Sequence, residues 1–178
     1  MAFLRKPLLL VLLLSAAAAP LRAQAPEYAL KAAFLFNFVK FVEWPASAFA
    51  GERTPMTICV FGNDPFGRAL DEVVQGERVG ERGLVVEHPD GLDDLEACHV
   101  LFVSGSEKDR FGEVLARVQG APVLTVGDSD GFLRAGGVIN FVLEGSKVRF
   151  LIDQEAAERS GLRISSKLMR LAVNAGSR

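Results

Sequence analysis

The chain has 178 residues, a formal net charge of −2 at pH 7 and no cluster of Lys or Arg. A mildly acidic chain of this kind lacks the positive patch that binding to nucleic acid or to an anionic membrane requires, so those partners are excluded. Its length suits a single domain that buries one core without a metal or several disulfides.

The first 23 residues have the pattern of a secretory signal peptide. A basic pair at residues 5–6 precedes an apolar run at residues 8–14, and a small-residue cleavage site ends at Ala23. The apolar stretch breaks at Pro20, short of the ~20 residues that cross a bilayer. We therefore expect cleavage after Ala23 rather than a retained membrane anchor. A cut two residues later would leave a proline first in the mature chain, which the peptidase tolerates poorly.

Cleavage would leave residues 24–178 as one domain in the periplasm, with no direct membrane insertion. Removal of residues 1–23 takes away 3 of the 20 basic residues and none of the 22 acidic ones, so the mature chain carries a net charge of −5. No further linker or repeat divides it.

Residues 27–44 predict one long helix, because they contain no Gly or Pro and are followed by Pro45. Asn37, Lys40 and Glu43 share one narrow face, and apolar side chains cover most of the rest. Such a helix needs burial on more than one side. Its aromatic residues are candidates for binding a partner, with core packing as the alternative: Phe34, Phe38, Phe41 and Trp44.

Short apolar strands then alternate with amphipathic helices. Strands are expected at residues 57–62, 84–88, 98–104 and 122–128, and helices at residues 64–75 and 107–119. Asp64 is expected to cap the first of these helices, with Pro65 at its first position. This alternation predicts a three-layer α/β/α domain with a mixed, mostly parallel sheet.

The C-terminal part predicts a β-hairpin at the sheet edge and two short helices. Residues 137–153 read as two strands around the turn Glu144-Gly145-Ser146. Residues 155–161 follow as a helical segment that Gly161 can end, and a last helix is expected from Ser165 or Ser166 to Val173.

Cys59 and Cys98 are the two cysteines, and both fall in or at the start of predicted core strands. Export to an oxidising compartment favours a disulfide between them. The alternative is two buried thiols on neighbouring strands that never meet, because bonding distance requires agreeing registers. A strained bond would be reducible, which leaves a redox-sensing role open.

No residue pattern typical of an enzyme, a metal site or a cofactor site is present. His88 and His99 have no partner at a metal-binding spacing, so structural roles are expected for both. Ser104 and Ser106 lie outside any G-x-S-x-G motif, and no phosphate-binding glycine motif occurs. Asp128 and Asp130 lack the later glutamate of a calcium loop, since residue 139 is Ile.

Two glycine-bearing segments follow predicted strands, at residues 62–67 and 127–137. Both are read as turns. In open α/β sheets the crevice beyond the strand ends is where ligands bind, so a ligand cleft is a second possibility. Its candidate residues are Asn63, Asp64, Asp128 and Asp130.

Five segments carry a further signal. They are KAAFLFNFVKFVEWP (31–45), CVFGNDPFGRAL (59–70), CHVLFVSGSE (98–107), PVLTVGD with DGFLRAGGVINFVLEGSKVRFLID (122–153) and GLRISSKLMRLA (161–172). In this order they resemble the YfiR family of periplasmic proteins, over nearly the whole mature chain.

The resemblance implies a regulator that represses a membrane-bound diguanylate cyclase by binding its periplasmic sensor domain. Such a protein restrains the synthesis of cyclic di-GMP and biofilm formation, and we expect a homodimer. The cysteine pair of the family matches Cys59 and Cys98, whereas the second pair that some members carry near the C-terminal hairpin is absent here. The alternative function is a small-molecule-binding module that uses the cleft, and an unrecognised hydrolase has no paired acid and base in its favour.

Overall fold

The structure is a computed structural model that describes residues 21–173, so residues 1–20 of the predicted signal peptide lie outside the described residues. The helices are α1 (Leu21–Phe41), α2 (Arg68–Val74), α3 (Phe111–Arg117), α4 (Gln154–Arg159) and α5 (Ser166–Leu171), with 3-10 helices η1 (Ala46–Ala48), η2 (Leu92–Ala97) and η3 (Gly105–Arg110). The strands are β1 (Val42–Glu43), β2 (Met56–Phe61), β3 (Arg78–Val79), β4 (Arg82–Glu87), β5 (Val100–Val103), β6 (Leu124–Gly127), β7 (Ile139–Glu144), β8 (Lys147–Ile152) and β9 (Arg163–Ile164).

The described residues form a seven-stranded sheet in the order β3-β4-β2-β5-β6-β7-β8. The ladders from β4 through β7 are parallel, whereas β3 and β8 pair antiparallel at the two edges. This confirms the predicted α/β domain with a mixed, mostly parallel sheet. The predicted hairpin is confirmed as well, because Glu144 pairs with Lys147 across the turn and Gly145 takes the positive φ that a tight turn needs.

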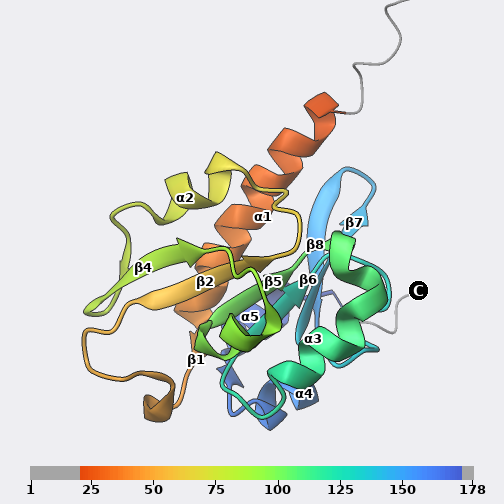
Figure 1. Ribbon diagram of the computed structural model, residues 1–178. Helices are drawn as coiled ribbons and strands as arrows, with labels where there is room; N and C mark the ends of the chain where they lie inside the picture. Colours follow the sequence, from red (N-terminus) through yellow and green to blue (C-terminus); the bar gives the residue numbers. More distant parts are fainter. Residues whose placement is uncertain (1–20, 174–178) are drawn as a thin grey trace, which may run out of the picture.

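Alternate residues of the central strands enter two separate apolar clusters. Ile58 and Val60 of β2 face the cluster that contains α1 and α2, whereas Cys59 and Phe61 face the cluster that contains η2 and α3. This period of two is why the strands read as continuous apolar runs in the sequence. Figure 1 shows α1 crossing one face of the sheet and extending past its edge, with α3 on the other side.

The first helix ends earlier than predicted. α1 stops at Phe41, and residues 42–43 form β1, which pairs antiparallel with β9. The carbonyl oxygen of Phe41 accepts a hydrogen bond from the backbone N–H of Ser165 over 2.9 Å. The β-branched Val42 therefore gains a strand partner, Ile164, that a sequence reading of residues 27–44 alone does not reveal.

The predicted cap of the second helix is also wrong. α2 begins at Arg68, after Gly67, which has a φ of 53°. Asp64 instead accepts a hydrogen bond from the N–H of Phe66 over 2.8 Å and so closes a turn ahead of the helix. Similarly, the helix predicted at residues 107–119 starts at Gly105 as the 3-10 helix η3 and becomes α-helical at Phe111.

Candidate functional site

The chain leaves β2 and β5 toward opposite faces of the sheet. From β2 it passes through α2 to β4 on one side, and from β5 it passes through η3 and α3 to β6 on the other side. α2 packs on the α1 face, whereas α3 packs on the opposite face. Such a reversal of strand order leaves a crevice between the diverging loops, where open α/β sheets bind ligands.

A cleft of about 460 Å³ opens at this reversal. Its walls come from four segments: Glu27, Tyr28 and Lys31 of α1, residues 63–65 after β2, residues 104–106 after β5, and residues 128–129 after β6. The carboxyl ends of three neighbouring parallel strands thus form the floor, and α1 closes one side.

A buried ion cluster joins α1 to the end of β6 in this cleft. Nζ of Lys31 lies 2.8 Å from Oδ2 of Asp128 and 2.6 Å from Oε1 of Glu27. The Lys31 and Asp128 side chains are only 5% and 7% exposed. Charges removed from water to this degree need close partners, so the pair fixes the position of α1 over the strand ends.

The Tyr28 hydroxyl completes the cluster by donating to the same Oδ2 of Asp128 over 2.8 Å. Burial, and then the hydrogen bond to Asp128, raise the pKa of Tyr28 far above its ordinary value. The hydroxyl therefore remains a donor throughout the neutral range. The ring also contacts the Lys31 ammonium, whose Nζ lies 4.2 Å from the ring centroid.

Lys31→Met is expected to lower the free energy of unfolding by about 2 to 3 kcal/mol, because the buried Asp128 carboxylate would lose its cationic partner and keep Tyr28 as its remaining donor. Adding Asp128→Asn to this variant should restore part of the loss, since no buried charge remains. Chemical denaturation of the wild type and both variants measures the two steps. A double variant no more stable than Lys31→Met would contradict a charge-based cause.

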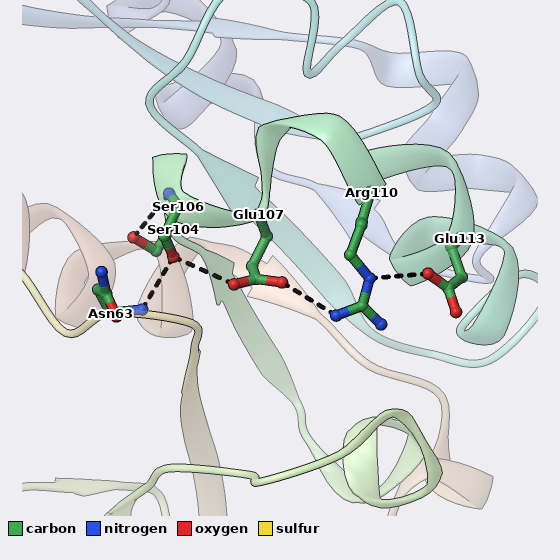
Figure 2. Close-up of polar contacts among 6 residues, drawn as sticks. All are labelled: Asn63, Ser104, Ser106, Glu107, Arg110 and Glu113. Atoms are coloured by element: carbon green, nitrogen blue, oxygen red, sulfur yellow. Dashed lines mark hydrogen bonds and ion pairs between the residues drawn. The ribbon is translucent and has the colours of Figure 1, made fainter.

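Polar contacts hold the loops after β2 and β5 together (Figure 2). The N–H of Asn63 donates to Oγ of Ser106 over 2.9 Å, and the Ser106 hydroxyl donates to Oε1 of Glu107 over 3.2 Å. Arg110 then binds Oε2 of Glu107 at 3.4 Å and Oε2 of Glu113 at 2.8 Å. The Glu107 carboxylate is therefore engaged by the Ser106 hydroxyl and by Arg110.

Three of the four predicted cleft residues lie in one cavity. Asn63, Asp64 and Asp128 line the cleft, and Asp130 lines an adjoining hollow of about 250 Å³ together with Asp128. Their binding of a ligand stays a prediction.

Sequence reasoning missed the contribution of α1 to this cleft. Tyr28 is the only tyrosine of the chain, and Lys31 stands one helical turn before the buried Leu35. A cation on the apolar face of a helix needs a buried acidic partner, and that signal could have identified both residues.

The aromatic residues predicted to bind a partner pack between α1 and the sheet. Phe38 is 0% exposed and its ring stacks 5.7 Å from that of Phe141, so it belongs to the core and offers no surface to a partner, which corrects the prediction for this residue. Phe34, Phe41 and Trp44 are half-buried against the same cluster. Partner binding by these three stays a prediction.

Cys59 and Cys98 form a disulfide, with their Cα atoms 5.8 Å apart. Cys59 lies within β2, whereas Cys98 directly follows η2 and precedes β5. The bond therefore joins β2 to the segment that enters β5, at the face covered by η2 and α3 and opposite the α1 face.

His99 lies at the amino-terminal end of β5, on the opposite edge of the sheet from the cleft. Its Nδ1 accepts a hydrogen bond from the N–H of Thr57 over 3.1 Å, and its Nε2 lies 3.1 Å from the carbonyl oxygen of Ala48. The ring stacks on Phe49 with centroids 4.7 Å apart. An acceptor at Nδ1 and a donor at Nε2 define the neutral imidazole.

Burial lowers the pKa of His99 from 6.5. The hydrogen bond to Ala48 opposes this shift, whereas the charge of Arg82 adds to it. The unfolded chain then binds a proton at a higher pH than the folded chain, so the free energy of unfolding should fall as the pH drops below about 6.5. His99→Gln should flatten this dependence, because an amide replaces both hydrogen bonds without titrating. Denaturation between pH 5 and pH 7, with the exposed His88→Gln as control, measures it; an unchanged slope in His99→Gln would contradict the assignment.

Within residues 21–173, no group of three or more His, Cys, Asp and Glu side chains is arranged to hold a metal ion. In that same stretch, no helix combines the length and apolar character that crossing a bilayer requires.

Comparison with known proteins agrees with this architecture. Residues 28–173 match the YfiR/HmsC-like family, DUF4154. A crystal structure of a conserved domain protein from Vibrio cholerae O1 biovar El Tor is similar in fold, with a TM-score of 0.55 and 11% identity over 82% of this chain and 59% of that chain. The ABC domain from Streptococcus pneumoniae, solved in complex with L-Trp, gives a TM-score of 0.48 and 10% identity over 66% of this chain and 54% of that one. The chain thus spans between half and two thirds of the length of these two structures. Because the family match extends from α1 to the end of α5, the chain belongs to the YfiR/HmsC-like family.

Proposed function

We propose that this protein is a periplasmic regulatory binding protein that inhibits an inner-membrane diguanylate cyclase by contacting its periplasmic sensor domain, and so lowers cyclic di-GMP. The observation that carries the proposal is membership of the YfiR/HmsC-like family over residues 28–173. The signal-peptide pattern of residues 1–23 supports the location.

The positions of the two histidines favour binding over bond chemistry. Both ring nitrogens of His99 contact backbone groups, and Nε2 of His88 lies 3.4 Å from Oδ2 of Asp64. Ser104 and Ser106 at the cleft contact each other and Glu107 instead of an imidazole base. The arrangement thus lacks the nucleophile–base contact that a serine hydrolase needs.

The proposed contact surface is the half-buried aromatic set Phe34, Phe41 and Trp44. Trp44 donates from Nε1 to the carbonyl oxygen of His99 over 3.3 Å, so its ring is held in place next to a partly open surface. A fixed aromatic ring loses little entropy on association, which makes it a good anchor. We also propose that the protein forms a homodimer.

Deletion of the gene should raise cyclic di-GMP, and the purified protein should bind the periplasmic domain of a cyclase encoded beside it. Trp44→Ala should weaken that binding at least about tenfold, as removal of an aromatic anchor does. The matched control is Leu143→Ala, which removes a side chain 53% exposed at the far end of the hairpin. Unchanged cyclic di-GMP after deletion, or equal binding by both variants, would count against the proposal.

Export is tested separately. Fractionation should place the protein in the periplasm, and N-terminal sequencing should begin at Gln24. Recovery of the full-length chain from the cytosol would contradict the proposed location.

A further inference from the structure

The segment of residues 44–55 joins β1 to β2 without pairing with a strand of the sheet. None of residues 44–55 is buried. Two of its aromatic side chains, Trp44 and Phe49, are half-buried against the core cluster on the α1 face. A segment of this kind is held by a few specific contacts, so it opens at a lower free-energy cost than the strand that follows it.

The buried His99 supplies the central contacts to this segment. Its Nε2 lies 3.1 Å from the carbonyl oxygen of Ala48, and its ring stacks on Phe49 with centroids 4.7 Å apart. The carbonyl oxygen of His99 accepts from Nε1 of Trp44 over 3.3 Å. On the side of the sheet, its Nδ1 accepts from the N–H of Thr57 over 3.1 Å. One histidine thus ties the 44–55 segment to the start of β2.

This arrangement requires a neutral imidazole. Protonation would place a hydrogen on Nδ1 that faces the N–H of Thr57, so a hydrogen bond would become a repulsion between two donors. Thr57 is fixed in the sheet, because it is paired with Val85 of β4 and its carbonyl oxygen accepts from the N–H of His99. The charged ring therefore has to move toward the exposed segment, where water can solvate it.

The charged groups near the ring disfavour an imidazolium in its present place. The Arg82 guanidinium of β4 lies 3.7 Å from the centroid of the Phe49 ring on which His99 stacks. Burial, and then this positive charge, lower the pKa of His99, against the opposing hydrogen bond to Ala48. The other charged side chains of the segment and of η2 are exposed to solvent: Glu52, Arg53, Asp93, Asp94 and Glu96.

We propose that His99 is a pH-sensitive latch, which holds the 44–55 segment on the sheet at neutral pH and releases it in a mildly acidic medium. Histidine suits this role because its charge changes in that pH range. The segment begins at Trp44, the aromatic anchor of the proposed contact surface, so its release should weaken partner binding. That consequence rests on the proposed function, whereas the latch itself is a property of the isolated protein.

Fluorescence of Trp44, the only tryptophan of the chain, reports on the segment directly. Between pH 7 and pH 4.5, the acrylamide quenching constant of the mature wild type should rise at least about twofold while its circular dichroism stays that of the folded protein. His99→Gln should abolish the rise, and His88→Gln should keep it. No rise in the wild type, an equal rise in His99→Gln, or a rise only together with global unfolding would overturn the latch.

Proton NMR decides the matter if His99→Gln does not fold. His88→Gln leaves His99 as the only histidine of the chain, so the ring signal gives its protonation midpoint with the latch intact. This midpoint should coincide with the midpoint of the quenching change. Midpoints that differ by more than about one pH unit would overturn the proposal.

Binding to the periplasmic cyclase domain tests the consequence separately. The affinity of the wild type should fall at least about fivefold across the quenching transition, whereas that of His99→Gln should change less than about twofold. An equal fall in both proteins would overturn the coupling of the latch to partner binding. A domain that binds neither protein at pH 7 would contradict the proposed function, while the fluorescence result would still decide the latch.

Discussion

Phe38→Ala is expected to lower the free energy of unfolding by about 3 to 5 kcal/mol. Phe38 is 0% exposed, and its ring lies 5.1 Å from that of Phe150 and 5.7 Å from that of Phe141. The truncation opens a cavity between α1 and the hairpin strands. Phe141 and Phe150 are fixed on paired strands, so their rings cannot fill this cavity unless the strands move. Urea denaturation measures the loss.

Phe36→Ala is the matched control, since it removes the same side chain from the same helix. Phe36 is half-exposed and its ring is contacted by the Lys40 ammonium, with Nζ 3.8 Å from the centroid. Loss of this contact should cost about 0.5 to 1 kcal/mol. Equal losses in the two variants would contradict a cavity-based cause, because the change in helix propensity from Phe to Ala is favourable at both positions and cannot produce a loss.

The same helix shows what the sequence could predict and what it could not. The alternation of apolar strands with amphipathic helices reflects burial on both faces of a parallel sheet, so the layered fold could be inferred from local patterns. The end of α1 depends on Ile164 pairing with Val42, a contact between residues far apart in the chain. Periodicity within residues 27–44 carries no information about that partner, so the sequence alone predicts a helix that runs past Phe41.

The candidate site was partly predictable for a similar reason. Asn63, Asp64 and Asp128 follow strands, and strand ends of a parallel sheet meet at one edge, so their common location followed from the fold class. That α1 lies across this edge and places Tyr28 and Lys31 in the cleft depends on tertiary packing. The sequence alone places Asp64 at the helix cap, whereas Gly67, with its positive φ, delays the start of the helix to Arg68.

Loss of the Cys59–Cys98 bond is expected to lower the free energy of unfolding by about 3 to 4 kcal/mol. The cysteines are 39 residues apart in the sequence, so the bond restricts a long loop of the unfolded chain. The folded chain should change little, because β2 and β5 remain paired from Ile58↔Val100 to Phe61↔Val103 without it. Denaturation of Cys59→Ala/Cys98→Ala against the wild type measures the loss.

Reduced wild-type protein separates the bond from the side chains. It keeps both sulfur atoms in the core, where Cys59 and Cys98 are 1% and 3% exposed, yet it lacks the restraint on the unfolded chain. Reductant should therefore lower the stability of the wild type by most of the loss seen in the double variant and should leave the double variant itself unchanged. Equal unfolding midpoints for oxidised and reduced wild type would show that the restraint contributes nothing, and any loss in the double variant would then come from packing around the two small side chains.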